Sequence, residues 1–170
     1  NLIRAKVLLG GTYLEMGDYD KAMEIYTSSL KQAEEIGDKR GIGSSLCNIG
    51  LVNKDKGDID TALDYHERSL AIFEELGDKR GVGNNLNNIG IVYSFKGDND
   101  KALDYYERSL EIFEELGDQY GMAGSLINIG NAYSDKGNYD KALDNCERSL
   151  AIFEELGDKL GMGISLNSIG

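Results

Sequence analysis

The amino-acid sequence predicts an all-α protein, a solenoid of antiparallel helix pairs that repeats every 40 residues. Nearly the same sequence stands at residues 58–78, 98–118 and 138–158, and a looser copy stands at 18–38. Apolar residues in each copy recur at steps of three and four, which places them on one stripe of a helix. A glycine followed by Asp or Asn separates the segments, and the chain has no proline. A repeat of this length is one supersecondary unit that buries its apolar face against its neighbours.

The segment 98–118 shows how the second helix of each unit is specified. Asp98 can cap the helix by accepting hydrogen bonds from the first free backbone N–H groups. Gly117 can adopt the left-handed conformation that ends a helix. Between them lies an apolar stripe, which consists of Ala102, Leu103, Tyr106, Leu110, Phe113 and Leu116.

In chain order, residues 1–16 form a first helix, Gly17 ends it, and Asp18 starts a second that runs to about Ile36. Because turns of two residues place consecutive helices antiparallel, we expect four helix pairs and a ninth helix from about Lys159. The chain is then a single solenoid. Its repeats are residues 1–36 (start truncated), 37–76, 77–116, 117–156 and the partial repeat 157–170. Since the sequence lacks an initial methionine and stops within the pattern, we expect a fragment of a longer protein.

The first helix of each pair carries a glycine that is expected to bring the partner helix close. In the third copy this residue is Gly90, and Ala102 is the small residue expected to meet it. The corresponding pairs are Gly10 with Ala22, Gly50 with Ala62, and Gly130 with Ala142. Glycine inside a helix costs roughly 1 kcal/mol relative to alanine, so its repetition indicates close packing. The second helices also carry acid–arginine pairs four residues apart, Asp64 with Arg68, Asp104 with Arg108, and Asp144 with Arg148.

The spacing of Leu86, Ile89, Gly90, Tyr93, Gly97, Ala102 and Tyr106 resembles the tetratricopeptide repeat (TPR). Leucine stands where that motif has tryptophan, and glutamate replaces its late proline at Glu34, Glu74, Glu114 and Glu154. The whole chain is similar to the 40-residue variety of kinesin light chains and Pins/LGN adaptors, and to TPR arrays of bacterial and archaeal signalling proteins. The resemblance implies a right-handed superhelix whose first helices line a concave groove that binds other proteins.

Residues on the groove face are therefore the candidate binding site. The first helices differ between copies more than the second helices do, which favours a face adapted separately in each unit. Apolar residues would form the floor, and asparagines would pair with the backbone of an extended peptide. The candidate residues are Val7, Cys47, Leu51, Lys54, Asn84, Asn87, Ile91, Ser94, Phe95, Ile127, Asn131, Ser134 and Asn167.

Two further features of this face limit the hypothesis. Asn48, Asn88 and Asn128 are the same in three copies, so we assign them to packing of the repeat itself. The carboxylate clamp of the family needs basic residues in the groove. Only Arg4 and Lys54 are available there, so this binding mode is not expected.

No catalytic, metal or cofactor site is expected. His66 occupies a packing position of the second helix, and no cysteine–histidine cluster has the spacing of a zinc site. The Gly-x-Gly at residues 81–83 follows a helix, whereas a dinucleotide-binding loop follows a strand. The acidic run around Asp98 lacks the glycine and the late glutamate of an EF-hand. We therefore expect a protein that is not an enzyme.

Charge and composition restrict the partners. The formal net charge is −12, so the basic surface that nucleic-acid binding needs is missing. No apolar run approaches the ~20 residues of a membrane span. Cys47 and Cys146 lie in different repeats, so no disulfide is expected, which fits a reduced, cytoplasmic setting.

Three functional interpretations remain open. The first is a protein–protein interaction scaffold that binds a peptide or helical segment along the groove. The alternative is a regulatory or sensor segment of a larger signalling enzyme or receptor, acting on its own chain. The third is end-to-end self-association through the apolar Leu166 and Ile169, which no helix follows.

Overall fold

The computed structural model describes residues 2–169, and the side chains of residues 2–168. These residues form helices and no strands, as the sequence predicts. The helices are α1 (Leu2–Glu15), α2 (Tyr19–Ile36), α3 (Lys39–Asp55), α4 (Ile59–Glu75), α5 (Lys79–Phe95), α6 (Asn99–Leu116), α7 (Gln119–Asp135), α8 (Tyr139–Leu156) and α9 (Lys159–Ile169). The chain divides into two compact units between Gly81 and Val82, within α5.

The predicted helix starts are confirmed. Each cap is an Asp or Asn whose side chain accepts a hydrogen bond from the backbone N–H three residues later, which satisfies one of the free donors of the first turn. For Asp38 this bond, from the N–H of Gly41, measures 2.9 Å. The same bond is made by Asp18, Asp58, Asp78, Asp98, Asp118, Asn138 and Asp158.

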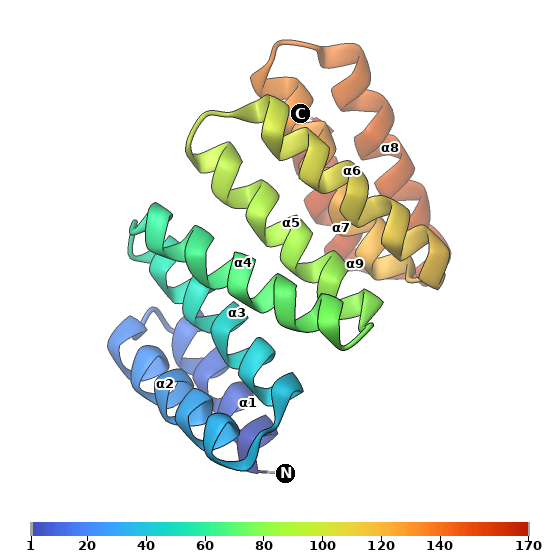
Figure 1. The fold of residues 1–170 in the computed structure, drawn as a ribbon. Helices are drawn as coiled ribbons and strands as arrows, with labels where there is room; N and C mark the ends of the chain where they lie inside the picture. Colours follow the sequence, from blue (N-terminus) through green and yellow to red (C-terminus); the bar gives the residue numbers. More distant parts are fainter. Residues whose placement is uncertain (1, 170) are drawn as a thin grey trace. The chain divides into compact units, whose positions relative to one another are not determined.

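The predicted helix ends are also confirmed. The glycine before each cap has a positive φ between 63° and 85°, in the left-handed region that L side chains avoid. The next backbone N–H then turns back onto the helix, as where Asp18 donates to the carbonyl of Tyr13 at 2.9 Å. Connections of two or three residues therefore suffice to stop one helix and start its antiparallel neighbour (Figure 1).

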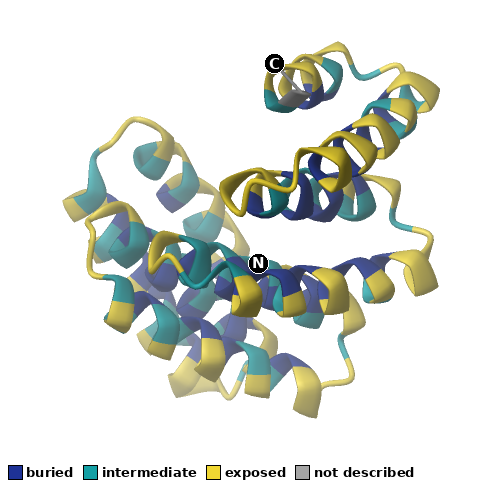
Figure 2. Ribbon diagram, turned by 90° about the horizontal axis from the view of Figure 1, so that it is seen from above, coloured by how far each residue is buried: buried dark blue, intermediate teal, exposed yellow. Residues whose placement is uncertain are grey.

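In the first unit α2 packs against both α1 and α3, and α3 packs against α4. Its core contains Ala22 and Tyr26 of α2 together with Ile49 and Val52 of α3. Each helix buries one side and exposes the other, as its amphipathic sequence requires (Figure 2). No helix here relies on a single central core, because each contacts its neighbours in turn.

The second unit repeats this arrangement, with α7 between α6 and α8, and α9 against α8. Its core cluster joins two helices, Ala102, Leu103, Tyr106 and Leu110 of α6 with Leu126, Ile129 and Ala132 of α7. Half-buried side chains including Tyr93 and Tyr133 pack against this cluster.

The structure shows which residues lie nearest to the helical glycines. The nearest neighbour of Gly90 is Tyr106 and not the predicted Ala102. A Cβ added to Gly90 would lie 2.5 Å from Cε1 of Tyr106, one turn further along α6. The alanines are buried, but the ring four residues later occupies the space that the glycine leaves. Gly10 likewise faces the ring of Tyr26, and Gly50 faces that of His66. Gly130 faces both Cys146, whose Sγ would lie 2.6 Å from an added Cβ, and its predicted partner Ala142, whose carbonyl oxygen would lie at 3.1 Å.

The Gly-x-Gly segments are packing sites for phenylalanine. A Cβ on Gly81 would lie 2.4 Å from the ring of Phe73, in the first unit. In the second unit Gly83 faces the ring of Phe113, which also packs against Gly121. These glycines let a large ring approach the backbone, which explains their spacing without a bound nucleotide.

A row of buried serines, which the sequence analysis did not single out, ties neighbouring helices together. In the first unit Ser69 of α4 donates to the carbonyl of Gly43 at 2.8 Å, and Ser45 of α3 donates to Ser29 of α2 at 3.0 Å. In the second unit Ser109 of α6 donates to the carbonyl of Gly83 at 2.9 Å and pairs with Ser125 of α7 at 3.2 Å. Each hydroxyl can donate and accept, so one residue joins two helices.

Other predicted contacts are present. Asp64 pairs with Arg68 at 3.3 Å, and Asp104 pairs with Arg108 at 3.6 Å. His66 is fully buried, as its packing position predicted. Neither cysteine forms a disulfide. In the described part of the chain no helix is both long and apolar enough to cross a membrane, and no group of three potential metal ligands comes together.

Candidate functional site

The predicted binding residues all lie on first helices, and none is buried. Asn84, Phe95, Asn131, Ser134 and Asn167 are exposed, whereas the other eight are half-buried. The opposite side of the same helices holds buried residues such as Leu86 and Leu126. We call the side that carries the predicted residues the first-helix face, and it is described separately for the two units.

In the first unit this face holds a pocket of about 530 Å³ between α1 and α3. Val7 lines it together with Ile3 and Ser44. The other predicted residues of this unit, Cys47, Leu51 and Lys54, are not part of its lining. Lys54 instead pairs with its neighbour Asp55 at 2.7 Å.

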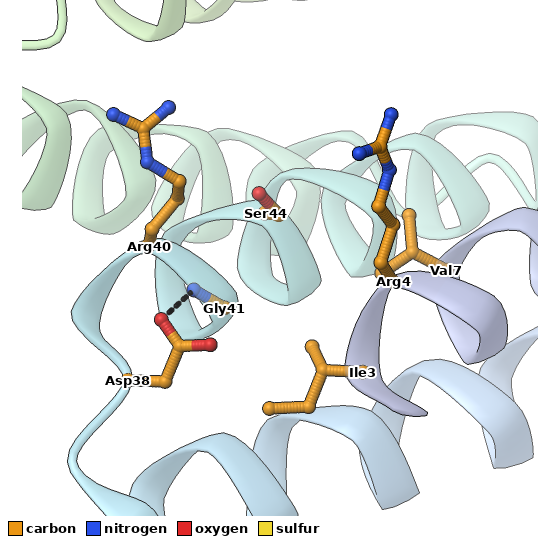
Figure 3. Close-up of a pocket in the computed structure, with 7 residues that line it drawn as sticks. All are labelled: Ile3, Arg4, Val7, Asp38, Arg40, Gly41 and Ser44. Atoms are coloured by element: carbon orange, nitrogen blue, oxygen red, sulfur yellow. Dashed lines mark hydrogen bonds between the residues drawn. The ribbon is translucent and has the colours of Figure 1, made fainter. Parts of the chain in front are cut away.

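Two arginines border this pocket on one side. Arg4 comes from α1 and Arg40 from the first turn of α3, and their guanidinium groups extend in the same direction with Ser44 between them (Figure 3). Arg40 forms an ion pair of 2.6 Å with Asp78, whose side chain is only 13% exposed. Asp38 accepts from the Gly41 N–H inside the pocket. The two carboxylates offset the two cations, so the pocket carries little net charge.

In the second unit the first-helix face holds a pocket of about 540 Å³ between α7 and α9. The structure brings three predicted residues together here, Ile127, Asn131 and Asn167. Leu160 and Ile164 of α9 add exposed apolar surface, being 76% and 49% exposed. Apolar side chains beside free amide groups can anchor a side chain of a ligand and pair with its backbone.

Other predicted residues of the second unit have partners within the chain. Asn87 accepts a hydrogen bond of 3.0 Å from the side-chain amide of Asn128. Asn128 thus serves the packing of the repeat, as predicted, and it occupies one acceptor of Asn87. Ile91 packs against the core cluster, and Ser94 lies against the hydroxyl of Tyr106. Asn84, Phe95 and Ser134 do not line the pocket.

Residues in the first turns of α3 and α9 also line the pockets, although they were not predicted from the sequence. Arg40 and Leu160 occupy the same position of the repeat, and both line a pocket. The signal that could have found them is the variation at this position, which is Arg40, Arg80, Tyr120 and Leu160 in successive copies.

Burial disfavours the ionised forms of two tyrosines and one cysteine beneath the first helices. Burial raises the pKa of Tyr26 to about 12, and it also raises the pKa of Tyr106. Burial likewise raises the pKa of the Cys146 thiol, which lowers its reactivity. The hypothesis of end-to-end self-association named Leu166 and Ile169. Leu166 is 53% exposed, whereas the side chain of Ile169 lies outside the described residues.

A family model described as tetratricopeptide repeat matches residues 1–75, 42–115 and 121–170. No curated protein matches the sequence significantly. Among solved structures, BtubC (BKLC) from P. vanneervenii is 27% identical over 92% of this chain and 65% of its own, with a TM-score of 0.78. The chain thus spans a little under two thirds of that relative.

Two further structures share the fold at lower identity. A putative kinesin light chain of nearly identical TPR-like repeats from Podosopora anserina is 15% identical, over 98% of this chain and 83% of its own, with a TM-score of 0.76. A Rap protein complexed with competence and sporulation factor is 19% identical, over 94% of this chain and 45% of its own, with a TM-score of 0.83.

Proposed function

Because this chain belongs to the tetratricopeptide repeat family, we propose that it is a non-catalytic protein-interaction scaffold that binds a peptide or helical segment of a partner on the first-helix face. The observation that carries the proposal is the pocket of the second unit, where Ile127, Asn131 and Asn167 converge beside the exposed Leu160 and Ile164. The similarity to a Rap protein bound to competence and sporulation factor supports a ligand of this kind.

The chemistry of the pocket indicates how such a segment is held. Ile127 and Ile164 offer apolar contact area, and burying such side chains against a ligand is favourable by about 25 cal/mol per Å². Asn131 and Asn167 each offer two donors and an acceptor, which matches the N–H and C=O groups of an extended backbone. An apolar side chain next to a backbone segment therefore satisfies both parts of the pocket.

The test is peptide selection followed by calorimetric titration. Peptides selected on the intact protein from a random displayed library should bind with a defined stoichiometry. Changing both Asn131→Ala and Asn167→Ala should weaken binding by about fivefold to 150-fold, since each loses a hydrogen bond of about 0.5–1.5 kcal/mol. Both residues are exposed, so unfolding should be unchanged.

A matched control exists on the same helix. Gln119 is an exposed amide at the start of α7 that does not line the pocket, so Gln119→Ala should leave the affinity unchanged. Equal affinity of the double variant and the control would contradict the proposal, as would a library that yields no specific peptide.

A further inference from the structure

A further cavity lies away from the first-helix face, at the junction of α6, α7 and α8 in the second unit. Its volume is about 300 Å³, at the lower end of the roughly 300–1,000 Å³ of typical ligand pockets. Leu110 and Ile129 provide its apolar wall, Tyr133 provides a ring, and Asn145 of α8 stands beside them. We call it the Asn145 cavity.

In the preceding helix pair of the same unit, α5–α6, a tyrosine occupies the position that corresponds to Asn145. Tyr105 stands 40 residues before Asn145, and its ring stacks on Tyr93 with centroids 5.5 Å apart and planes 10° apart. Lys101 lies 5.0 Å from the centroid of Tyr93, and the guanidinium of Arg108 lies 5.2 Å from that of Tyr105. The stacked pair is thus held between two cations, an arrangement that aromatic rings favour.

The pair α7–α8 keeps every part of this arrangement except one ring. Tyr133 corresponds to Tyr93, and Lys141 lies 4.9 Å from its centroid, as Lys101 does in the earlier pair. Arg148, the counterpart of Arg108, lines the cavity. Only the second tyrosine is replaced, by Asn145, and the cavity lies beside the ring that it would have covered.

The first unit supplies an independent precedent. Tyr65 stands 80 residues before Asn145, and it packs with Leu30 against the cluster that contains Ile49. Leu30 and Ile49 are the counterparts of Leu110 and Ile129, which form the apolar wall of the cavity. Arg68 lies 5.2 Å from the ring centroid of Tyr65. A tyrosine ring therefore fits this position of the repeat in two other copies.

Asn145 adds a polar group that those copies lack. It is only 8% exposed, and its Nδ2 donates to the carbonyl of Lys141 at 2.8 Å. In the described part of the chain nothing donates to its Oδ1, which can therefore accept from a ligand. The cavity thus combines a ring face, an apolar wall, two cations, the carboxylates of Glu107 and Asp144, and an unused acceptor.

From these contacts we propose that the Asn145 cavity binds the phenol ring of a tyrosine side chain supplied by a partner protein. The ring stacks on Tyr133 as Tyr105 stacks on Tyr93, the cations Lys141 and Arg148 face its π system, and its hydroxyl is a donor for Asn145. This site is separate from the first-helix face, so it does not depend on the function proposed above.

The test uses p-cresol, which is the tyrosine side chain as a free molecule, and N-acetyl-tyrosinamide, which represents a tyrosine within a chain. Titration of the intact protein is followed by NMR at the ring of Tyr133 and the side-chain amide of Asn145. Both probes should produce saturable shifts at these two groups. Toluene, which lacks the donor, and N-acetyl-leucinamide, which lacks the ring, should bind about tenfold more weakly or not at all.

Asn145→Tyr is the variant that closes the cavity with a ring of the chain itself. It should raise the melting temperature and reduce p-cresol binding by at least about tenfold. Tyr105→Asn is the matched reverse variant, and it should create a second p-cresol site against Tyr93. Tyr133→Leu keeps the apolar wall without the ring, and it should weaken binding in an otherwise folded protein.

Several outcomes would overturn the proposal. Unchanged p-cresol binding in Asn145→Tyr would place the ligand elsewhere, and a lower melting temperature of this variant would show that a ring does not fit. Equal binding of toluene or the leucine derivative would make the cavity an unspecific apolar site. Binding of p-cresol without binding of N-acetyl-tyrosinamide would assign the cavity to free phenols and exclude a protein tyrosine.

Discussion

The two units share a buried serine contact and differ in the residues that line their first-helix pockets. Ser69 donates to Gly43 in the first unit as Ser109 donates to Gly83 in the second, at 2.8 and 2.9 Å. On the first-helix face, by contrast, the pocket of the first unit carries arginines, whereas that of the second carries Leu160 and Ile164. Buried positions restrict the size and polarity of a side chain, and exposed positions do not. We therefore expect the exposed residues of each pocket to set the binding preference of its unit.

The largest effect is expected at the helical glycines that face a ring. Gly10→Ala places a Cβ 2.5 Å from the ring of Tyr26, and Gly90→Ala does the same at Tyr106. Overpacking of this kind costs about 1–3 kcal/mol, so both variants should lower the free energy of unfolding, measured in urea, by similar amounts.

Gly11 is the matched control for Gly10, because it is the next residue of α1. An added Cβ there meets nothing closer than the Tyr26 hydroxyl at 3.8 Å. Gly11→Ala should therefore stabilise the protein by about 0.5–1 kcal/mol through helix propensity. Equal stability of Gly10→Ala and Gly11→Ala would contradict the close approach of α1 to Tyr26 of α2 at Gly10.

The next effect is expected at the buried serines. Ser69→Ala and Ser109→Ala each remove a buried hydrogen bond to a carbonyl of the paired helix, and Ser109→Ala also removes the partner of Ser125. Each should cost about 1–2 kcal/mol in urea unfolding. Ser134→Ala, at an exposed position of α7, should change the free energy by less than about 0.5 kcal/mol. A loss in either buried variant as small as that of Ser134→Ala would contradict the role of the buried serines.

The tyrosine pair Tyr26 and Tyr106 should distinguish the two units. The hydroxyl of Tyr26 is buried without a hydrogen-bond partner, whereas that of Tyr106 has Ser94 beside it. Since a buried unsatisfied group is unfavourable, Tyr26→Phe should stabilise the protein by about 1 kcal/mol, and Tyr106→Phe should not. Melting curves of the two variants provide the comparison, and an equal response would contradict it.

The burial of Tyr26 also predicts that the free energy of unfolding falls at alkaline pH. Burial raises the pKa of Tyr26 to about 12 in the folded state, whereas an exposed tyrosine ionises near about 10. The protonated phenol is therefore favoured by folding, and its contribution is complete below pH ~10 and is lost as the pH rises toward ~12. Urea unfolding at pH 8 and pH 11 should show a smaller loss in Tyr26→Phe than in the native sequence.

The helix boundaries could be predicted because they depend on local chemistry. The bond from Asp38 to the N–H of Gly41 and the positive φ of Gly37 involve residues within one turn. Partners across helices were harder to predict. Gly90 was paired with Ala102 and not with Tyr106, because the relative register of two helices depends on how their side chains interlock, which a repeat pattern does not specify.

The candidate sites were predictable only in part, for the same reason. The exposed asparagines could be found from their variation between copies, and the structure gathers Asn131 and Asn167 in one pocket. Asn87 looked equivalent, but its bond to Asn128 depends on the spacing of two repeats. The replacement of Tyr105 by Asn145 is visible in the sequence. That it opens a cavity follows only from the meeting of three helices at this position.

The smallest effect is expected at the exposed ion pairs, which both units contain. Lys56 pairs with Asp20 at 3.0 Å in the first unit, and Lys136 pairs with Asp100 in the second. The aspartates are 92% and 83% exposed, so water and salt screen both pairs. Lys56→Ala and Lys136→Ala should each change the free energy of unfolding by less than about 0.5 kcal/mol. Even this difference should vanish in about 1 M salt, where the Debye length is about 3 Å. A larger loss of unfolding free energy in one variant alone, which persists in about 1 M salt, would mean that its unit depends on this surface ion pair in place of the buried contacts.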